Sequence, residues 1–133
     1  MSRRVWLPYW LVLELHHAQI AEHGGAAGIR DEGLLESALA RPVNAHAYGV
    51  EDVCDLAALY AAGIIRNHPF VDGNKRTGFI LSELFLNLNG MVLDASNESV
   101  IASILMLAGG EWTDREYAAW LRENSRAGGP AAG

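Results

Sequence analysis

The sequence has little of several features that would point to particular classes of protein. Its 133 residues include one cysteine, Cys54, so an internal disulfide is excluded and nothing indicates an oxidising compartment. Ten Lys and Arg residues stand against 16 Asp and Glu, a formal net charge of −6, which argues against a general nucleic-acid binder. The apolar run after Arg3 and Arg4 is similar to a secretion signal, but Pro8 interrupts it, Glu14 ends it, and it is too short to span a membrane. We therefore expect a cytoplasmic protein that binds neither nucleic acid nor a membrane.

Apolar residues at helical spacing are abundant. Half of the residues are apolar, enough for one core, and the length is that of a single domain. Apolar positions that recur every three or four residues predict an all-α fold, a compact bundle of about six helices. The predicted helices cover 8–23, 31–40, 53–67, 74–89, 97–108 and a last segment that begins at 113.

Local signals set the predicted boundaries. Arg41–Pro42 is expected to end the second helix, because a residue before proline avoids the helical region, and 43–51 is then a loop or flap. Thr113 and Glu116 fit a capping box at the start of the last helix. Residues 91–94 are predicted to be extended. The domain is expected to cover 1–124, and the small residues of 125–133 predict a disordered tail.

Residues 66–78, RNHPFVDGNKRTG, join the two helices that the pattern buries most deeply. The helix after this loop begins near Gly73 and Asn74, and its first main-chain N–H groups have no partner within the helix. Together with the helix dipole, such groups form an anion site, and a glycine lets an anion approach closely. Lys75 and Arg76 add full positive charges. This segment therefore predicts a phosphate-binding cradle.

A carboxylate and an imidazole stand beside the predicted cradle. Asp72 precedes it directly, and Mg²⁺ is commonly shared between one or two carboxylates and phosphate oxygens. His68 is the only side chain in the loop that exchanges a proton near neutral pH. Phe70 is predicted to anchor the loop in the core. Cradle, cation ligand and base together predict a site for phosphoryl or nucleotidyl transfer.

Each of these features alone also has an ordinary structural explanation. His68 could be a hydrogen-bonded structural histidine, Asp72 an N-cap, and the basic run a solvated turn. Two other motifs are excluded. The Walker loop needs adjacent Gly and Lys, whereas Asn74 separates Gly73 from Lys75. A zinc site would need further His or Cys ligands at close spacing.

The stretch HPFVDGNKR, residues 68–76, closely resembles the motif of the Fic/Doc family, His-x-Phe-x-Asp/Glu-Gly/Ala-Asn-x-Arg. The similarity covers roughly residues 15–121. It implies the helical Fic/Doc fold, with the active-site loop between two central helices. The implied roles are general base for His68, Mg²⁺ ligand for Asp72, anion-hole segment for Gly73, Asn74 and Lys75, and phosphate clamp for Arg76. Arg66 is either a further phosphate contact or an ordinary cation at a helix C-terminus.

Three positions bear on the branch of the family. AMP-transferring Fic enzymes typically have glycine where this sequence has Lys75, and a second arginine where it has Phe79. Both differences favour the Doc (death-on-curing) branch, whereas Gly73 is the Fic-like residue. The Doc branch implies a toxin that, with Mg²⁺, transfers the γ-phosphate of ATP to a threonine of elongation factor EF-Tu and halts translation. The alternatives are AMP transfer to a protein hydroxyl and a non-catalytic nucleotide- or partner-binding module.

The sequence also bears on how the activity would be inhibited. The resemblance implies that a self-inhibited Fic protein would have an inhibitory helix that reads Ser/Thr-x-x-x-Glu followed by Gly or Asn. No Ser or Thr here has Glu four residues later. The resemblance therefore implies a separate antitoxin protein, whose inhibitory segment folds on binding. His16 and His17 are interpreted as packing or capping residues of the first helix.

Overall fold

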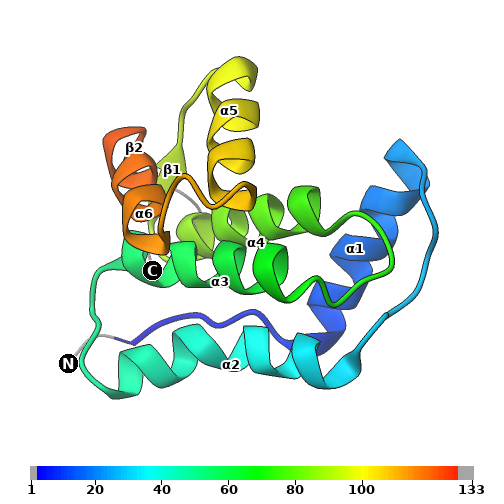
Figure 1. Ribbon diagram of the computed structural model, residues 1–133. Helices are drawn as coiled ribbons and strands as arrows, with labels where there is room; N and C mark the ends of the chain where they lie inside the picture. The colour runs from blue at the N-terminus through cyan, green and yellow to red at the C-terminus, as the bar shows by residue number, and fades with distance from the viewer. Residues whose placement is uncertain (1–2, 129–133) are drawn as a thin grey trace.

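The computed structural model describes residues 3–128 and forms six helices and a small two-stranded sheet in that range (Figure 1). In chain order the elements are α1 (Tyr9–His23), α2 (Glu32–Ala47), α3 (Val53–Asn67), α4 (Asn74–Leu88), β1 (Met91–Leu93), α5 (Asn97–Ala108), α6 (Asp114–Glu123) and β2 (Ser125–Ala127). The predicted all-α class is confirmed. No helix within residues 3–128 is long and apolar enough to cross a membrane.

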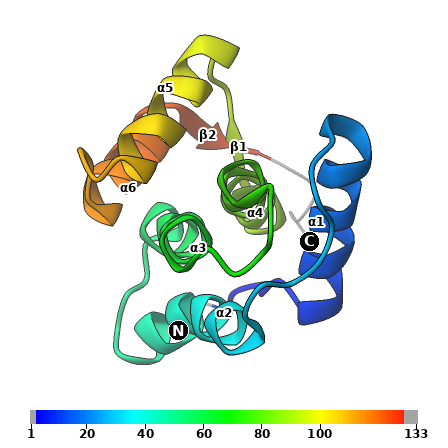
Figure 2. The ribbon, with the colours of Figure 1, turned by 45° about the vertical axis from the view of Figure 1, so that its right-hand side comes forward.

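Helix α3 occupies the centre of the bundle, and α2, α4 and α6 pack against it (Figures 1 and 2). Ten of its 15 residues are buried, as its nearly continuous apolar sequence predicted. Two glycines allow close approach of its neighbours. A Cβ on Gly63 would lie 3.1 Å from the Cβ of Ala38 in α2, and one on Gly78 in α4 would lie 2.9 Å from Cγ1 of Ile65. These crossings bring α3 and α4 together, and the loop between them is therefore held at one end of a rigid pair.

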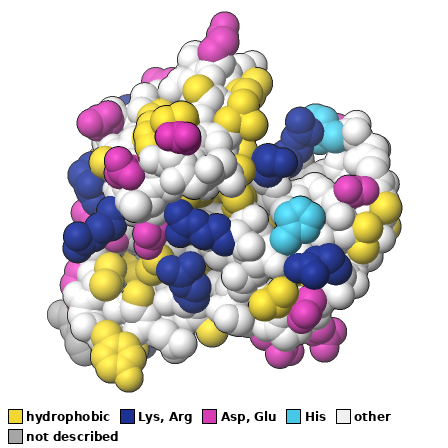
Figure 3. Space-filling model, viewed as in Figure 1, with side chains coloured by type: hydrophobic (Ala, Val, Ile, Leu, Met, Phe, Trp, Pro, Cys, Tyr) yellow, Lys and Arg dark blue, Asp and Glu magenta, His cyan; other side chains and the backbone are white. Residues whose placement is uncertain are grey.

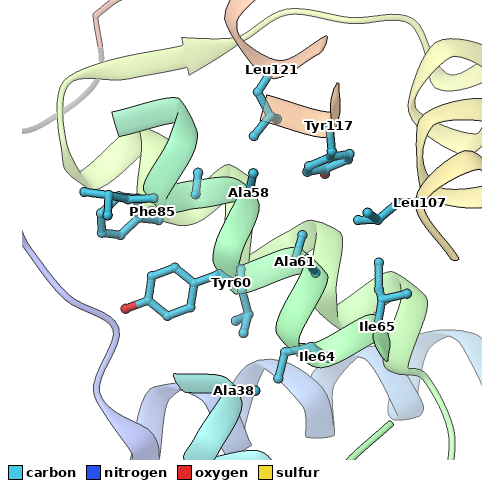
Figure 4. Close-up of a cluster of buried hydrophobic side chains, with 14 of the residues drawn as sticks. Ala38, Ala58, Tyr60, Ala61, Ile64, Ile65, Phe85, Leu107, Tyr117 and Leu121 are labelled. Atoms are coloured by element: carbon cyan, nitrogen blue, oxygen red, sulfur yellow. The ribbon is translucent and has the colours of Figure 1, made fainter. Parts of the chain in front are cut away.

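Aromatic side chains fill the space around α3 (Figure 4). Tyr60 packs on Phe85 of α4 with ring centroids 5.2 Å apart, and its hydroxyl accepts a hydrogen bond from the main-chain N–H of Leu7. Tyr117 of α6 is fully buried, and its hydroxyl is hydrogen-bonded to that of Ser82 at 3.1 Å. Burial raises the pKa of both tyrosines. The buried hydroxyls are thus satisfied, as core polar groups are expected to be.

The predicted end of α2 at Arg41–Pro42 was wrong, and so was the predicted flap over 43–51. Helix α2 continues through Pro42 to Ala47, and the connection to α3 is short. A proline inside a helix removes one main-chain hydrogen bond. Here the Pro42 ring is buried, and the N–H of Tyr48 bonds to the carbonyls of Asn44 and Ala45 to close the last turn. Tertiary packing of the ring therefore outweighs the local preference to stop.

The first residues of the predicted disordered tail are ordered. Ser125–Ala127 form β2, which pairs antiparallel with β1 in the register Met91↔Ala127 and Leu93↔Ser125. The main-chain N–H of Asp94 extends the pairing by bonding to the carbonyl of Asn124 at 2.8 Å. The small residues of 125–127 gave no sign of this strand, because its pairing partner is the distant segment 91–93. The prediction that this partner segment is extended was correct. Residues 129–133 of the predicted tail lie outside the described residues.

The start of α6 agrees with its sequence signal. The Thr113 hydroxyl accepts a hydrogen bond from the N–H of Glu116, and the Glu116 carboxylate accepts one from the N–H of Thr113, so the predicted capping box is confirmed. Helices α1 and α5 both contact α4 and stand on either side of it (Figure 1). This arrangement leaves the N-terminus of α4 open between two arms, α1 and α5.

Candidate active site

The loop between α3 and α4 begins at a residue in an unusual conformation. His68 caps the C-terminus of α3 with φ 54° and ψ 51°, the left-handed region, and is the only non-glycine residue of the range 3–128 with positive φ. For a residue with a side chain this conformation costs about 1 kcal/mol or more. Such strain persists only where surrounding contacts impose it. The His68 side chain is exposed, so the strain does not arise from burying the ring.

Asn74 closes the loop from its other end. Its side-chain Oδ1 accepts a hydrogen bond from the N–H of Phe70, and its Nδ2 donates to the carbonyl of Phe70, both at 3.0 Å. Both residues are buried, and Phe70 is fully so, as its predicted role of core anchor requires. The carboxamide thus acts as a clamp that satisfies both main-chain groups of Phe70. The sequence placed Asn74 in the anion-hole segment but did not indicate this clamp.

The segment before α2 lies along the loop and holds it in several places. Ile29 and Phe70 form an isolated antiparallel bridge, and the N–H of Val71 donates to the carbonyl of Gly28 at 3.0 Å. The Arg30 side chain reaches the end of α3: Nε donates to the carbonyl of His68 at 2.7 Å, and Nη2 donates to that of Asn67 at 2.9 Å. Sequence reasoning gave Arg30 no role, because no local pattern relates it to a helix end 37 residues later.

His16 of α1 is a second residue whose contact with the site was not predicted. Its ring stacks on that of Phe70, with centroids 3.8 Å apart and planes 6° from parallel. Its Nε2 lies 2.8 Å from the carbonyl oxygen of Asp72, so this nitrogen carries the proton and donates. The packing role predicted for His16 is therefore confirmed, and the surface that it packs against is the motif loop. Its burial, with 5% exposed, fits this supporting function.

The motif residues line a cavity of about 710 Å³ between α1, the N-terminus of α4 and α5. Figure 3 shows apolar side chains gathered on the α5 arm, with Lys, Arg and His side chains lower down and on the opposite side. Six of the seven predicted site residues line this cavity, namely His68, Asp72, Gly73, Asn74, Lys75 and Arg76. The structure therefore brings these groups together around one opening.

Arg66, the seventh predicted residue, is not among the lining residues. Its Nη2 donates to the carbonyl of Trp112 at 3.2 Å, so its side chain joins the end of α3 to the segment before α6. This contact favours the second of the two interpretations, an ordinary cation near a helix C-terminus.

The anion cradle has the properties that an N-terminal helix site requires. Gly73 has φ 79°, a conformation that favours glycine, and it provides no side-chain cap for α4. Within residues 3–128 the main-chain N–H groups of Asn74, Lys75 and Arg76 form no hydrogen bond, and the first turn of α4 has no acidic residue. Free N–H groups and two neighbouring cations are the features that binding of a phosphate would require here.

Asp72 presents a carboxylate at the edge of this cradle. Its Oδ2 accepts a hydrogen bond from the N–H of Ala26 at 2.7 Å, whereas Oδ1 has no hydrogen-bond partner in the described residues. No group of three or more His, Cys, Asp or Glu residues suited to a metal occurs within 3–128. One open carboxylate oxygen next to a phosphate cradle fits Mg²⁺, because this ion keeps waters and takes its other ligands from phosphates.

The α5 side of the cavity is apolar. Ile101 and Leu105 are 58% and 56% exposed, and both line the cavity. Ser103 and Leu107 are the buried residues of α5.

A smaller cavity of about 280 Å³ adjoins it along α4, and Ile80 lines both. Glu83 lines the smaller cavity, and burial raises the pKa of its carboxyl.

Comparison with known proteins agrees with this geometry. The family model described as Fic/DOC family matches residues 6–86, more than half of the chain. The chain belongs to the Fic/DOC family.

Two curated relatives identify the branch. The chain is 43% identical over 86 residues to "Toxin Doc" of Mycolicibacterium smegmatis, a match that covers 62% of this chain and 65% of that protein, just under two thirds of its length. It is 35% identical over 88 residues to "Protein kinase doc" of Escherichia phage P1, which covers 65% of this chain and 70% of the phage protein. Both relatives are Doc proteins, in agreement with the branch that Lys75 and Phe79 predicted.

Proposed function

We propose that this chain is a Doc-like toxin that transfers the γ-phosphate of ATP to a hydroxyl group of a protein. One observation carries the proposal: a candidate base, a carboxylate with an open oxygen and a candidate phosphate cradle line the same cavity. The name of one relative, "Toxin Doc", supports the toxin part of the proposal, and that of the other, "Protein kinase doc", supports the reaction class.

The chemical step needs little covalent participation by the protein. His68 accepts the proton of the target hydroxyl, and the hydroxyl oxygen attacks the γ-phosphorus. The bond from the γ-phosphorus to the bridging oxygen breaks, and ADP leaves with that oxygen. The N–H groups at residues 74–76 and the charges of Lys75 and Arg76 stabilise negative charge on the phosphates. Asp72 Oδ1 would hold Mg²⁺, which neutralises phosphate charge when bound.

The positions of the cations around the cavity favour transfer of phosphate over transfer of AMP. AMP transfer expels pyrophosphate, and a second arginine on α4 would clamp that leaving group. The position holds Phe79, which is half-buried and lines the cavity. Lys75 and Arg76 are the Lys and Arg residues that line the cavity, and transfer of a γ-phosphoryl group needs mainly positioning, metal and positive charge.

Labelled nucleotides test the proposal. Purified protein is incubated with Mg²⁺ and with candidate protein targets, elongation factor EF-Tu first, using ATP labelled at either the γ- or the α-phosphate. We expect label on the target from γ-labelled ATP alone, and none with the His68→Ala variant. Label from the α-position alone would assign the chain to AMP transfer. ATP binding without transfer to any target in a bacterial lysate would make it a non-catalytic module.

The toxin assignment includes a separate antitoxin and a cytoplasmic setting, where ATP and the translation machinery are found. It is supported by the absence of an inhibitory Ser/Thr-x-x-x-Glu pattern from the sequence. Expression of the chain should arrest bacterial growth, and the His68→Ala variant should not. Growth arrest that persists with the His68→Ala variant would separate toxicity from catalysis.

A further inference from the structure

We propose that Arg30 is a positioning residue for the reaction, which holds the His68 main chain in the left-handed conformation that presents its imidazole to the cavity. This inference rests on the proposed function, because it concerns the residue assigned as the base. Arg30 does not line the cavity and touches no proposed substrate group, so it acts through His68.

The end of α3 explains why such a residue is needed. The last carbonyls of a helix have no partner within it, and a left-handed cap usually relieves this with glycine and a following N–H. The cap here is His68, and the residue after it is Pro69, which has no N–H. Arg30 supplies the donors from another segment, with Nε and Nη2 on the carbonyls of His68 and Asn67. Positive charge at a helix C-terminus strengthens both bonds.

The main chain around Arg30 fixes the direction of its side chain. The N–H groups of Arg30 and Asp31 both donate to the carbonyl of Pro69, at 2.6 and 3.0 Å. The Asp31 carboxylate accepts from the N–H of Leu34, which holds this segment at the start of α2. The guanidinium therefore holds His68, while the main chain of the same segment holds Pro69. Because Arg30 is exposed, its contribution comes from these bonds and not from core packing.

The cradle is held by different contacts. The Asn74 clamp on Phe70 and the His16 contact with Asp72 do not involve Arg30. Removal of the guanidinium should consequently misplace the base while leaving the phosphate site intact. This separation gives a kinetic signature that a general loss of stability does not produce.

The test compares Arg30→Ala and Arg30→Lys with the wild type in the γ-phosphate assay. For Arg30→Ala we expect kcat to fall about 10- to 100-fold with an unchanged KM for ATP, since small displacements of a reacting group have effects of this size. The kcat of Arg30→Lys should lie between those of Arg30→Ala and the wild type, because one ammonium group cannot reproduce the two donors of the guanidinium. Guanidinium ion at concentrations far below denaturing ones should restore part of the activity of Arg30→Ala, since the site is exposed.

Arg4→Ala is the matched control, because the Arg4 guanidinium also donates to a main-chain carbonyl, that of Glu51, away from the cavity. It should have wild-type kcat and no response to guanidinium ion. A raised KM with wild-type kcat for Arg30→Ala would make Arg30 an ATP ligand and overturn the proposal. Wild-type activity of Arg30→Ala would overturn it as well. An inactive wild-type protein would refute the proposed function instead.

Hydrogen exchange provides a readout that does not depend on activity. In Arg30→Ala the amide of Val71 should exchange faster, while amides of α4 after its first turn keep their wild-type rates. Unchanged exchange at Val71 would show that Arg30 does not order the loop. Should Arg30→Ala fail to fold, Arg30→Lys is measured in the same two experiments, and wild-type results for it would overturn the proposal.

Discussion

At its N-terminus α3 is capped by Asp52, whose carboxylate accepts hydrogen bonds from the N–H groups of Cys54 and Asp55. Arg122 of α6 donates to Asp52 at 3.2 Å and to Asp55 at 3.0 Å. At its C-terminus the same helix is capped by a left-handed histidine that precedes a proline. The first end follows the local preferences of helices, and the second departs from them.

The difference separates stability from function within one helix. At its N-terminus, where α3 contributes no side chain to the cavity, the capping residue is one that helices locally prefer. Where it delivers a side chain to the cavity, the strained His68 is held by Arg30 from the segment before α2, and the following Phe70 is held by Asn74 of α4. Strain of this kind is typical of functional sites, where geometry matters more than local free energy. Substitutions at the two ends should therefore have opposite consequences.

The largest expected effect is at His68. Replacing His68 with glycine removes the proposed base, so the rate of phosphate transfer should fall about 100- to 10,000-fold. Glycine also removes the penalty of the left-handed conformation, so the free energy of unfolding should rise by about 1 kcal/mol. Activity assays and urea denaturation measure the two quantities. His68→Ala is the control, because it should lose the same activity without the gain in stability; equal stabilities of the two variants would contradict the strain.

Next in size is the clamp at Asn74. Asn74→Ala leaves the buried N–H and carbonyl of Phe70 without their partners, so it should lower the free energy of unfolding by about 2–3 kcal/mol. Activity should fall too, because the cradle and the loop share this contact. Asn87→Ala is the control on the same helix, because the Asn87 side chain forms no hydrogen bond within residues 3–128, and it should change stability by less than about 0.5 kcal/mol. Similar values for the two variants would mean that the clamp does not order the loop.

At the other end of α3, Asp52→Ala should be costly for stability and neutral for catalysis. Loss of an N-cap lowers the free energy of unfolding by about 1 kcal/mol. The kcat and the KM for ATP should stay at wild-type values, because Asp52 lies at the far end of the helix from His68. Thermal denaturation and the γ-phosphate assay check both parts. A marked loss of kcat in a folded Asp52→Ala protein would contradict the separation between the two ends.

The smallest effect concerns the charge of Asp52. Burial alone would raise the pKa of Asp52, but hydrogen bonds from Arg122 and from main-chain N–H groups outweigh it, so the pKa lies below 3.8. The ionised form is therefore favoured by folding, and its contribution is present above pH 3.8 and is lost as the pH falls through the folded-state pKa. Asn also caps helices well, so Asp52→Asn isolates the charge. Because the pair with Arg122 is half exposed, the variant should be less stable by under about 1 kcal/mol near neutral pH.

Denaturant titrations at several pH values measure this difference. The gap between wild type and Asp52→Asn should be constant near neutral pH and should narrow as the pH falls below about 4. A gap that widens in acid would give the wrong sign and would contradict the lowered pKa.

Local patterns in the sequence were enough to predict much of the fold. Apolar spacing located α3 and α4, residues 113–116 indicated a capping box, and the motif HPFVDGNKR indicated residues that line one cavity. These features depend on groups within a few residues of one another, so a single stretch of sequence contains all the partners. The resemblance to Fic/Doc proteins added the roles, which stay predictions.

Other features depend on contacts between segments that are far apart in the sequence. Burial of Pro42 kept α2 helical, pairing with β1 ordered Ser125–Ala127, and the open flank of α5 left Ile101 exposed. Likewise, His16 and Arg30 reach the motif loop from segments that precede it by tens of residues. Local pattern cannot show such contacts, because their free energy arises only when distant segments are packed together. The chemical groups of the site were thus readable in the sequence, whereas the contacts that orient them required the fold.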